Sequence, residues 1–211
     1  LERLEKSLHQ KSIELDGVVK MGRTQLQDAV PIRLGQSFEA YAAVIGRDIR
    51  RIREQIDELK YLNIGATAVG TAINVNPVYL FHIIRNINLV CQTECVQADD
   101  LFDATQNLDC FVHTSSTLRI CAVNLSKICN DLRLLSSGPK AGLGEINLPP
   151  RQNGSSIMPG KINPVIPEVV SQVAFNIIGN DVTVTMAAEA GQMELNAFEP
   201  VIFYKIFESI D

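Results

Sequence analysis

Residues 118–135 read LRICAVNLSKICNDLRLL and carry the clearest indication of architecture in the chain. Apolar side chains recur there in alternating steps of three and four residues. A mean spacing of about 3.5 is typical of helices that pack nearly parallel in a bundle. The apolar positions are Leu118, Cys121, Leu125, Ile128, Leu132 and Leu135. This segment therefore predicts a long helix that buries one face against other helices.

Further helices are predicted on both sides of this segment. A second amphipathic pattern places charged residues between apolar ones at Phe38, Tyr41, Ile45, Ile49, Ile52, Ile56 and Leu59. A shorter helix is predicted over residues 77–91 and another long one over residues 164–190, while residues 18–32 are compatible with a short β-hairpin. The expected fold class is all-α, a bundle of long helices with this hairpin as its β element.

The composition excludes several classes of protein. With 46% hydrophobic residues among 211, the chain has enough apolar side chains for a sizeable core or a subunit interface. Its net charge of −5 provides no extended positive field, so we expect no nucleic-acid partner. No apolar run reaches the roughly 18–20 residues that cross a bilayer, so we expect no membrane partner and a cytoplasmic protein.

The cysteines favour reduced, buried thiols over a disulfide framework, because they are odd in number and lie in stretches predicted as helix. They are Cys91, Cys95, Cys110, Cys121 and Cys129. We interpret Cys91 and Cys95 as two small apolar residues one helical turn apart, since no second cysteine pair or nearby histidine completes a zinc site. We therefore predict no metal site.

Residues 136–162 hold five glycines and four prolines, a composition that predicts a long loop. Structureless connections longer than about 12–15 residues are uncommon in compact domains and are often functional. The next helix has a marked start, with Asn163 as its expected cap, Pro164 at the first helical position and Pro167 still in the first turn. The loop is therefore the first place to look for chemistry.

Residues 154–164, within and just after this loop, read GSSIMPGKINP. Two hydroxyls, a cation and an amide thus come directly before a helix N-terminus, where free N–H groups and the helix dipole favour an anion such as a dicarboxylate. These eleven residues resemble the signature loop of the aspartase/fumarase superfamily. Further resemblance covers nearly the whole chain, including residues 127–139, 165–170 and 187–192.

The resemblance implies a role for each part of this loop. It implies that Ser155 is the catalytic base and that Lys161 and Asn163 bind the substrate carboxylate. A serine hydroxyl is a poor base unless neighbouring N–H groups or a cation stabilise its oxyanion. Which groups do so cannot be read from the sequence. The other implied site residues support the loop and its surroundings: Gly154, Ser156, Met158 and Glu168.

A second motif, residues 20–31, reads KMGRTQLQDAVP and is similar to the superfamily segment in which a Thr-His or Thr-Gln pair reaches the substrate. The resemblance implies that Thr24 and Gln25 bind the substrate. Fumarases normally have histidine where Gln25 stands, so Gln25 favours the aspartase branch. In fumarases that histidine pairs with the glutamate that corresponds to Glu168, and whether Gln25 meets Glu168 stays open.

The resemblance implies a lyase that reversibly eliminates ammonia from L-aspartate to give fumarate. Ser155 would remove the C3 proton, and the charge would spread into the adjacent carboxylate as an enediolate, so donors aimed at that carboxylate are needed. No organic cofactor is implied, and although some members respond to divalent cations, no ligand cluster in the sequence places one. Two alternatives stay open, a fumarate hydratase of the same superfamily and a non-catalytic helical scaffold.

The resemblance also implies a homotetramer whose active sites are each shared between three subunits. All of residues 1–211 would correspond to the central helical domain, with the family's N-terminal and C-terminal domains absent from this chain. Leu1 opens a helical pattern without a cap, and Asp211 ends a stretch that is still periodic. We therefore expect a piece of a longer polypeptide, inactive when isolated.

Overall fold

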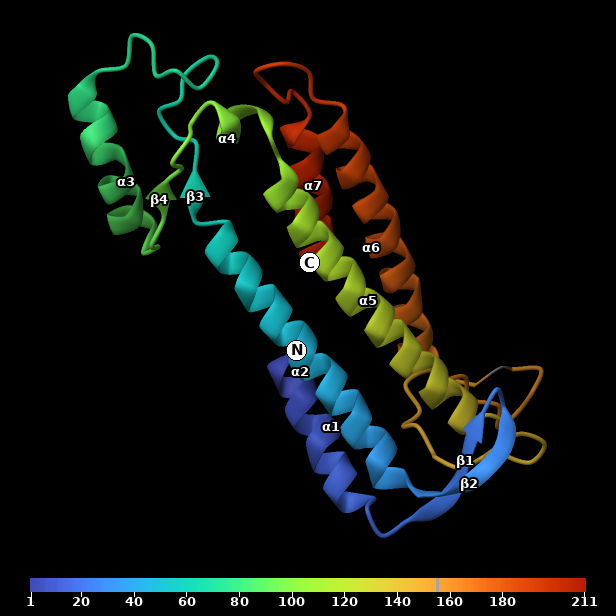
Figure 1. Ribbon diagram of the computed structural model, residues 1–211. Helices are drawn as coiled ribbons and strands as arrows, with labels where there is room; N and C mark the ends of the chain where they lie inside the picture. The colour runs from blue at the N-terminus through green and yellow to red at the C-terminus, as the bar shows by residue number, and fades with distance from the viewer. Residues whose placement is uncertain (155) are drawn as a thin grey trace. The chain divides into compact units, whose positions relative to one another are not determined.

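The computed structural model describes residues 1–154 and 156–211 (Figure 1). Helices dominate these residues, and the strands form two small two-stranded sheets. In chain order the elements are α1 (Glu2–Glu14), β1 (Val19–Thr24), β2 (Gln27–Arg33), α2 (Leu34–Glu58), β3 (Tyr61–Leu62), α3 (Pro77–Cys91), β4 (Val96–Gln97), α4 (Asp103–Gln106), α5 (Asp109–Leu135), α6 (Val165–Glu189) and α7 (Glu199–Ile210). The prediction of a helical chain with a hairpin is confirmed.

Two compact units make up the chain, and each is described by itself. Unit 1 consists of residues 1–51 and 120–172, and unit 2 consists of residues 52–119 and 173–211. The helices α2, α5 and α6 contribute residues to both units. Both motifs of the predicted site belong to unit 1.

The core of unit 1 is apolar and comes from α1, α2 and α5. Ile45 lies at its centre with 0% of its surface exposed. The buried members of the core are Leu8, Leu34, Phe38, Tyr41, Ala42, Ile45, Ile49 and Ile128. Most of these residues from α2, and Ile128 from α5, belong to the predicted apolar patterns, so the spacing identified the buried faces correctly.

The carboxylate of Asp48 is buried beside this core, with 1% exposure. The Nδ2 of Asn124 donates to both carboxylate oxygens at 3.0 and 2.9 Å, and Nη1 of Arg51 donates to Oδ1 at 2.8 Å. A buried carboxylate without such partners would be strongly destabilising. These donors therefore stabilise the negative charge of the Asp48 carboxylate between α2 and α5 in unit 1.

The helix α2 follows β2 without a loop. At the junction, the side chain of Gln36 satisfies a backbone N–H group. Its Oε1 accepts a hydrogen bond from the Arg33 N–H at 3.0 Å, as the third helical residue does in a capping box. Gly35 lets α1 approach closely, since a Cβ at this position would lie 2.3 Å from the carbonyl oxygen of Ser12. The base of the hairpin is thus fixed to the helices of unit 1.

Unit 2 has an apolar core of its own, formed mainly by α5, α6 and α7. Val184 and Ile202 are both 0% exposed. The rings of Phe111 and Phe203 meet edge to face with their centroids 4.9 Å apart. Aromatic pairs favour this geometry, so the two rings fix the packing of α5 against α7.

Asn196 closes the C-terminal end of α6. Its side chain is almost fully buried, and its Nδ2 donates to the carbonyls of Ala187 and Ala188 at 3.1 and 3.0 Å. Its Oδ1 accepts from the N–H of Phe198 at 2.8 Å. One amide thus satisfies carbonyls that the helix end leaves without a helical donor and fixes the turn into α7.

The interpretation of Cys91 and Cys95 as helical neighbours is wrong. The helix α3 ends at Cys91, and Gln92 follows in the left-handed conformation with a φ of 54°, so Cys95 lies beyond the helix. Cys91 is exposed, and Cys95 and Cys110 are only partly buried. Cys121 and Cys129 alone among the five free thiols are buried as expected.

The buried thiols of α5 are poor nucleophiles. Burial raises the pKa of Cys121 to about 11, and it also raises the pKa of Cys129. Both side chains are therefore neutral at physiological pH and act as packing residues.

Within the described residues, no helix combines the length and the apolar character that a bilayer span needs.

The predicted start of α6 is one residue too early. The helix begins at Val165 and not at Pro164. Asn163 contributes its backbone there, because the N–H of Val165 donates to the Asn163 carbonyl at 2.9 Å. The carbonyl of Pro164 accepts from the N–H of Glu168 at 3.3 Å, and Pro167 falls in the first turn as predicted.

Candidate active site

The hairpin of β1 and β2 carries two predicted site residues at its tip. Thr24 pairs with Gln27 across the strands, which leaves Gln25 and Leu26 as a two-residue turn. Their φ angles are 54° and 62°, the positive values that a type I′ turn requires. For a residue other than glycine, this conformation costs about 1–3 kcal/mol. The shape of the tip is therefore imposed by the strands on either side of it.

The side chains at this tip are available to a ligand. Thr24 and Gln25 are both exposed. Within residues 1–154 and 156–211, neither side chain forms a hydrogen bond. A threonine hydroxyl and a glutamine amide offer both donors and acceptors, which suits a substrate that carries carboxylates and an amino group.

A cluster of charges holds the hairpin below its tip. The Nζ of Lys20 lies 3.0 Å from Oε2 of Glu145, and Nη1 of Arg23 donates to Oε1 of Glu145 at 2.6 Å. The Nε of Arg23 also donates to Oδ1 of Asp28 at 3.1 Å, across the hairpin. Burial acts to raise the pKa of Glu145, but the hydrogen bonds and charges of Arg23 and Lys20 outweigh it and lower that pKa. Glu145 is therefore an anion at neutral pH.

The segment that carries the signature motif folds back on itself. A Cβ on Gly154 would lie 2.8 Å from the carbonyl oxygen of Lys161, so the two ends of the segment are close together. The N–H of Lys161 donates to the carbonyl of Met158 at 3.2 Å, and Gly160 has a φ of 83°, which favours glycine. The tight return at Met158–Lys161 therefore depends on Gly160.

The charged and polar groups of this segment are exposed. Ser156, Met158, Lys161 and Asn163 all face solvent. Within the described part of the chain, no carboxylate forms an ion pair with the Lys161 ammonium. Ser155, the predicted base, lies outside the described residues. The segment thus offers a cation without a carboxylate partner among residues 1–154 and 156–211.

Asn163 lines a cavity of about 290 Å³ at the start of α6. The lining residues are Leu132, Leu148, Pro149, Arg151, Asn163, Pro164, Val165, Ile166 and Pro167. Fewer backbone donors face this cavity than the sequence indicated, because Pro167 has no N–H and the N–H of Val165 is bonded to Asn163. The N–H of Ile166, in the first turn of α6, has no hydrogen-bond acceptor among the described residues.

Glu168 has a cation partner that the sequence did not reveal. Its Oε1 lies 3.5 Å from Nη2 of Arg133, a residue of the last turn of α5. No hydrogen bond among the described residues joins Glu168 to Gln25. The ion pair links α5 to α6 in unit 1, close to the cavity that Asn163 lines.

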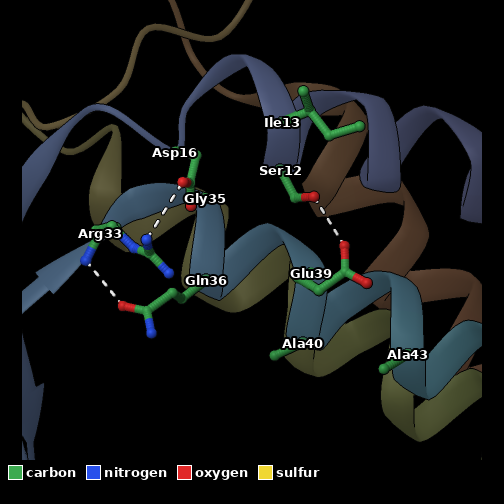
Figure 2. A pocket seen from close by; sticks show the side chains of 9 residues that line it. All are labelled: Ser12, Ile13, Asp16, Arg33, Gly35, Gln36, Glu39, Ala40 and Ala43. Carbon is green, nitrogen blue, oxygen red and sulfur yellow. Dashed lines mark hydrogen bonds and ion pairs between the residues drawn. The ribbon is translucent and has the colours of Figure 1, made fainter.

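A larger hollow in unit 1, of about 580 Å³, lies between α1 and the start of α2 (Figure 2). Figure 2 shows Arg33 beside Asp16 and Gln36, and Ser12 donating to Glu39. Its lining mixes small side chains with charges of both signs. None of the predicted site residues lines this hollow, so it is separate from the candidate site.

The chain brings together some of the predicted residues and not others. Gly154, Met158 and Lys161 lie in one folded segment, and Asn163 and Glu168 lie beside it at the start of α6. No hydrogen bond or ion pair among the described residues joins the Thr24–Gln25 turn to any of them. Charged residues that sequence reasoning missed do connect the hairpin to the loop, namely Lys20, Arg23 and Glu145. The one signal for them was a glycine inside a predicted strand, Gly22, which is typical of a bulge.

Comparison with known proteins identifies related chains. A sequence model of the family described as "Lyase" matches residues 1–179. The "Aspartate ammonia-lyase" of Bacillus subtilis is 53% identical over 210 residues, which cover 100% of this chain and 44% of that protein. The protein of the same name from Helicobacter pylori is 55% identical over 209 residues, covering 99% of this chain and 45% of that protein. The chain thus spans less than half the length of these relatives.

Solved structures with the same fold come from the same group of proteins. A Brucella melitensis structure described as "fumarate lyase:delta crystallin" bound to cobalt superimposes with a TM-score of 0.96 at 53% identity, covering 99% of this chain and 45% of that chain. A class II fumarase from Schistosoma mansoni superimposes with a TM-score of 0.87 at 34% identity, covering 99% of this chain and 47% of that chain.

Proposed function

Because this chain belongs to the lyase family, we propose that it is part of an enzyme that reversibly splits L-aspartate into fumarate and ammonia. The observation that carries the proposal is the identity of 53–55% to aspartate ammonia-lyases along the entire chain. The fumarase from Schistosoma mansoni is less similar, at 34%. Gln25 at a position where fumarases normally have histidine supports the same choice.

The proposed reaction begins with proton removal from C3 of L-aspartate. Ser155, as its oxyanion, takes this proton and becomes a neutral hydroxyl. The electron pair of the C3–H bond moves into the adjacent carboxylate, which becomes an enediolate. When the enediolate collapses, the C2–C3 double bond forms and ammonia leaves C2. The protein must therefore stabilise a second negative charge on one carboxylate.

Lys161 is the group best suited to stabilise this charge. Its ammonium is exposed and has no carboxylate partner in the described part of the chain, so an incoming anion meets no competitor. The carboxamide of Asn163 and the N–H of Ile166 add neutral donors at the start of α6, where the helix dipole also favours an anion. Lys161 and Asn163, placed in this way, bind the dicarboxylate and keep it bound while negative charge builds up on one of its carboxylates.

Thr24 and Gln25 are proposed to hold the substrate from another direction. Thr24 ends β1, and Gln25 follows it in the exposed turn, whose strained backbone is common for residues that bind ligands. Their side chains have no partner among the described residues and can pair with the amino group or a carboxylate of L-aspartate.

We further propose a homotetramer in which each active site takes residues from three subunits. Exposed apolar side chains along α6 support this assembly, because a surface this apolar is typical of a subunit interface. In unit 1 they are Ile166 and Val169, and in unit 2 they are Val173, Phe175, Val182 and Met186. The isolated chain would then be inactive. A cytoplasmic location, predicted from the sequence, belongs to the same proposal.

No metal takes part in the proposed mechanism. A relative from Brucella melitensis was solved with cobalt. Within the described residues of this chain, no group of three or more His, Cys, Asp or Glu side chains is arranged to bind a metal ion. The residues therefore do not fit a metal site in a single chain, and the proposed steps use protein groups alone.

The proposal is tested with the full-length protein, meaning a polypeptide of the relatives' length that contains this chain. Formation of fumarate is followed by its ultraviolet absorbance, first from L-aspartate and then from L-malate. The proposal predicts turnover of L-aspartate and its near-complete loss in Ser155→Ala. Turnover of L-malate alone would instead identify a fumarate hydratase. An inactive protein on both substrates would favour the non-catalytic scaffold.

A further inference from the structure

Lys20 and Arg23 should not be able to reach the same side chain. Successive residues of a strand point to opposite faces, so residues three apart lie on opposite sides of the hairpin. The register of β1 against β2 is interrupted between Met21 and Arg23, at Gly22. Two residues of β2, Ala29 and Val30, lie opposite Gly22 there, as in a β-bulge whose extra residue belongs to β2. Both cations nevertheless meet the single carboxylate of Glu145.

The bulge depends on the glycine. A Cβ at Gly22 would lie 2.9 Å from both Cγ2 of Ile32 and the carbonyl oxygen of Val30. The strands would have to separate to accommodate any larger residue. Gly22 thus lets the two strands of the hairpin approach each other closely between Lys20 and Arg23.

Glu145 is itself held firmly at that point. Its N–H donates to the carbonyl of Leu135 at 2.8 Å, at the C-terminal end of α5. Ile146, the next residue, packs against the apolar core of unit 1. The side chains of Glu145 and Lys20 are only 18% and 12% exposed. The carboxylate is therefore a fixed anchor, attached to α5 and placed on the loop that leads to the signature segment.

We propose that Glu145 is a positioning residue for the substrate-binding turn of Thr24 and Gln25. This inference rests on the proposed function. Neither side chain forms a hydrogen bond or ion pair within the described residues, so the place of the turn is set by the strands that carry it. Arg23 immediately precedes Thr24, and its guanidinium joins Glu145 on one side and Asp28 on the other. Glu145 thus sets the direction in which Thr24 approaches the substrate.

The charge balance explains why a neutral residue would not replace Glu145. Lys20 and Arg23 carry two positive charges, which Glu145 and Asp28 balance. Without the Glu145 carboxylate, the positive charges of Lys20 and Arg23 face each other. Asp28, which is exposed, then pairs with Arg23 alone. Repulsion between Lys20 and Arg23 then pushes β1, which carries both cations, away from the loop. A displacement of about 1 Å at a substrate contact can lower catalysis by about 100-fold.

The test compares Glu145→Gln with Glu14→Gln in the full-length protein. Glu14 pairs with Lys11 on α1, in the same unit, and forms no ion pair with the hairpin within the described residues, so its replacement is a matched loss of one paired carboxylate. We expect Glu145→Gln to raise KM for L-aspartate and to lower kcat/KM by about 10- to 100-fold. The control variant should stay within about twofold of wild type.

Two further measurements separate positioning from a loss of folded protein. Unfolding would lower kcat and leave KM unchanged, whereas a misplaced turn raises KM. In a double-mutant cycle, Thr24→Val should add little to Glu145→Gln if Glu145 acts through Thr24. Additive effects would overturn the inference. Arg23→Gln, which leaves the pair of Lys20 and Glu145, provides a milder variant if Glu145→Gln does not fold.

The outcomes for this inference and for the proposed function are distinguishable. If wild type turns over L-aspartate and Glu145→Gln has the same kcat and KM, the positioning role is wrong while the lyase proposal stands. If wild type has no activity on L-aspartate, the lyase proposal fails and the positioning role fails with it. A raised KM in Glu145→Gln, with Glu14→Gln unchanged, supports both.

Discussion

Replacing Lys161 by glutamine tests the source of charge stabilisation directly. The ammonium of Lys161 is exposed and makes no ion pair within the described residues, so its loss removes no stabilising contact of the fold. Surface substitutions of this kind usually change stability by less than about 0.5 kcal/mol. The thermal unfolding temperature of the full-length variant should therefore equal that of wild type.

The expected effect on catalysis is large. A single preorganised donor to a developing oxyanion contributes about 100- to 1000-fold to kcat. Lys161 supplies a full charge at the same place and is the only cation of the motif at residues 154–164, while Arg151 lies outside the motif on the cavity that Asn163 lines. We therefore expect kcat/KM for L-aspartate to fall by at least about 100-fold, with kcat carrying most of the loss because the charge develops in the transition state.

The assay follows fumarate absorbance over a range of L-aspartate concentrations. Lys140→Gln is the matched control, because Lys140 is another exposed lysine of the same long loop and lies outside the signature motif. The control should keep wild-type kcat and KM. If Lys161→Gln stays within threefold of wild type, or if only KM rises, the assignment of Lys161 to the enediolate is refuted.

Three more results are expected from the packing and the charges. Ile45→Ala should lower the free energy of unfolding by about 2–5 kcal/mol, measured by urea titration, because Ile45 is 0% exposed at the centre of unit 1. Asn196→Ala should cost about 1–3 kcal/mol in the same titration, since carbonyls at the end of α6 lose their donor. The pKa of Glu145 is lowered in the folded state, so its contribution to stability is fully present above its ordinary pKa of 4.5 and is lost as the pH falls through the lower folded-state value. The stability difference between wild type and Glu145→Gln should therefore be constant near neutral pH and shrink in acid.

Each of these expectations has a result that contradicts it. An Ile45→Ala variant as stable as wild type would mean that unit 1 does not pack around this residue. An unchanged stability in Asn196→Ala would show that water replaces the amide at the end of α6. A stability difference for Glu145→Gln that grows as the pH falls would reverse the sign of the linkage and place the carboxyl in a different environment.

The long helices were predictable because their buried faces are apolar at regular spacing. The early part of α5 was not predicted, although the helix begins at Asp109. Its buried side chains there include Thr114, Ser115 and Thr117, which are polar. The hydroxyl of Thr114 donates to the carbonyl of Cys110 within the same helix at 2.9 Å. A buried hydroxyl satisfied in this way leaves no apolar pattern to detect.

The small elements of unit 2 escaped prediction for a different reason. The strands β3 and β4 are two residues each, and they pair in parallel across more than thirty residues of chain. Two residues cannot show an alternating pattern. The exposure of Cys91 was missed as well, although α3 ends at Cys91 as the predicted range of residues 77–91 indicated.

The parts of the candidate site that consist of consecutive residues could be predicted from sequence. The contacts that folding makes between distant residues could not. The run from Gly154 to Pro164 and the pair of Thr24 and Gln25 were both found from sequence. Glu145 stands more than a hundred residues from Lys20 and Arg23, and the pairing of β1 with β2 is irregular between these two cations. Such a contact depends on register and tertiary packing, which local patterns do not specify.

The most direct test is a structure of the full-length protein with a non-reacting dicarboxylate bound. The proposed lyase predicts that one carboxylate contacts Lys161 and Asn163, with Ser155 of the same chain facing the carbon next to it, while Thr24 of another subunit reaches the ligand. A dicarboxylate bound away from Lys161, or an assembly in which Ser155 and Lys161 face no shared cavity, would contradict the account.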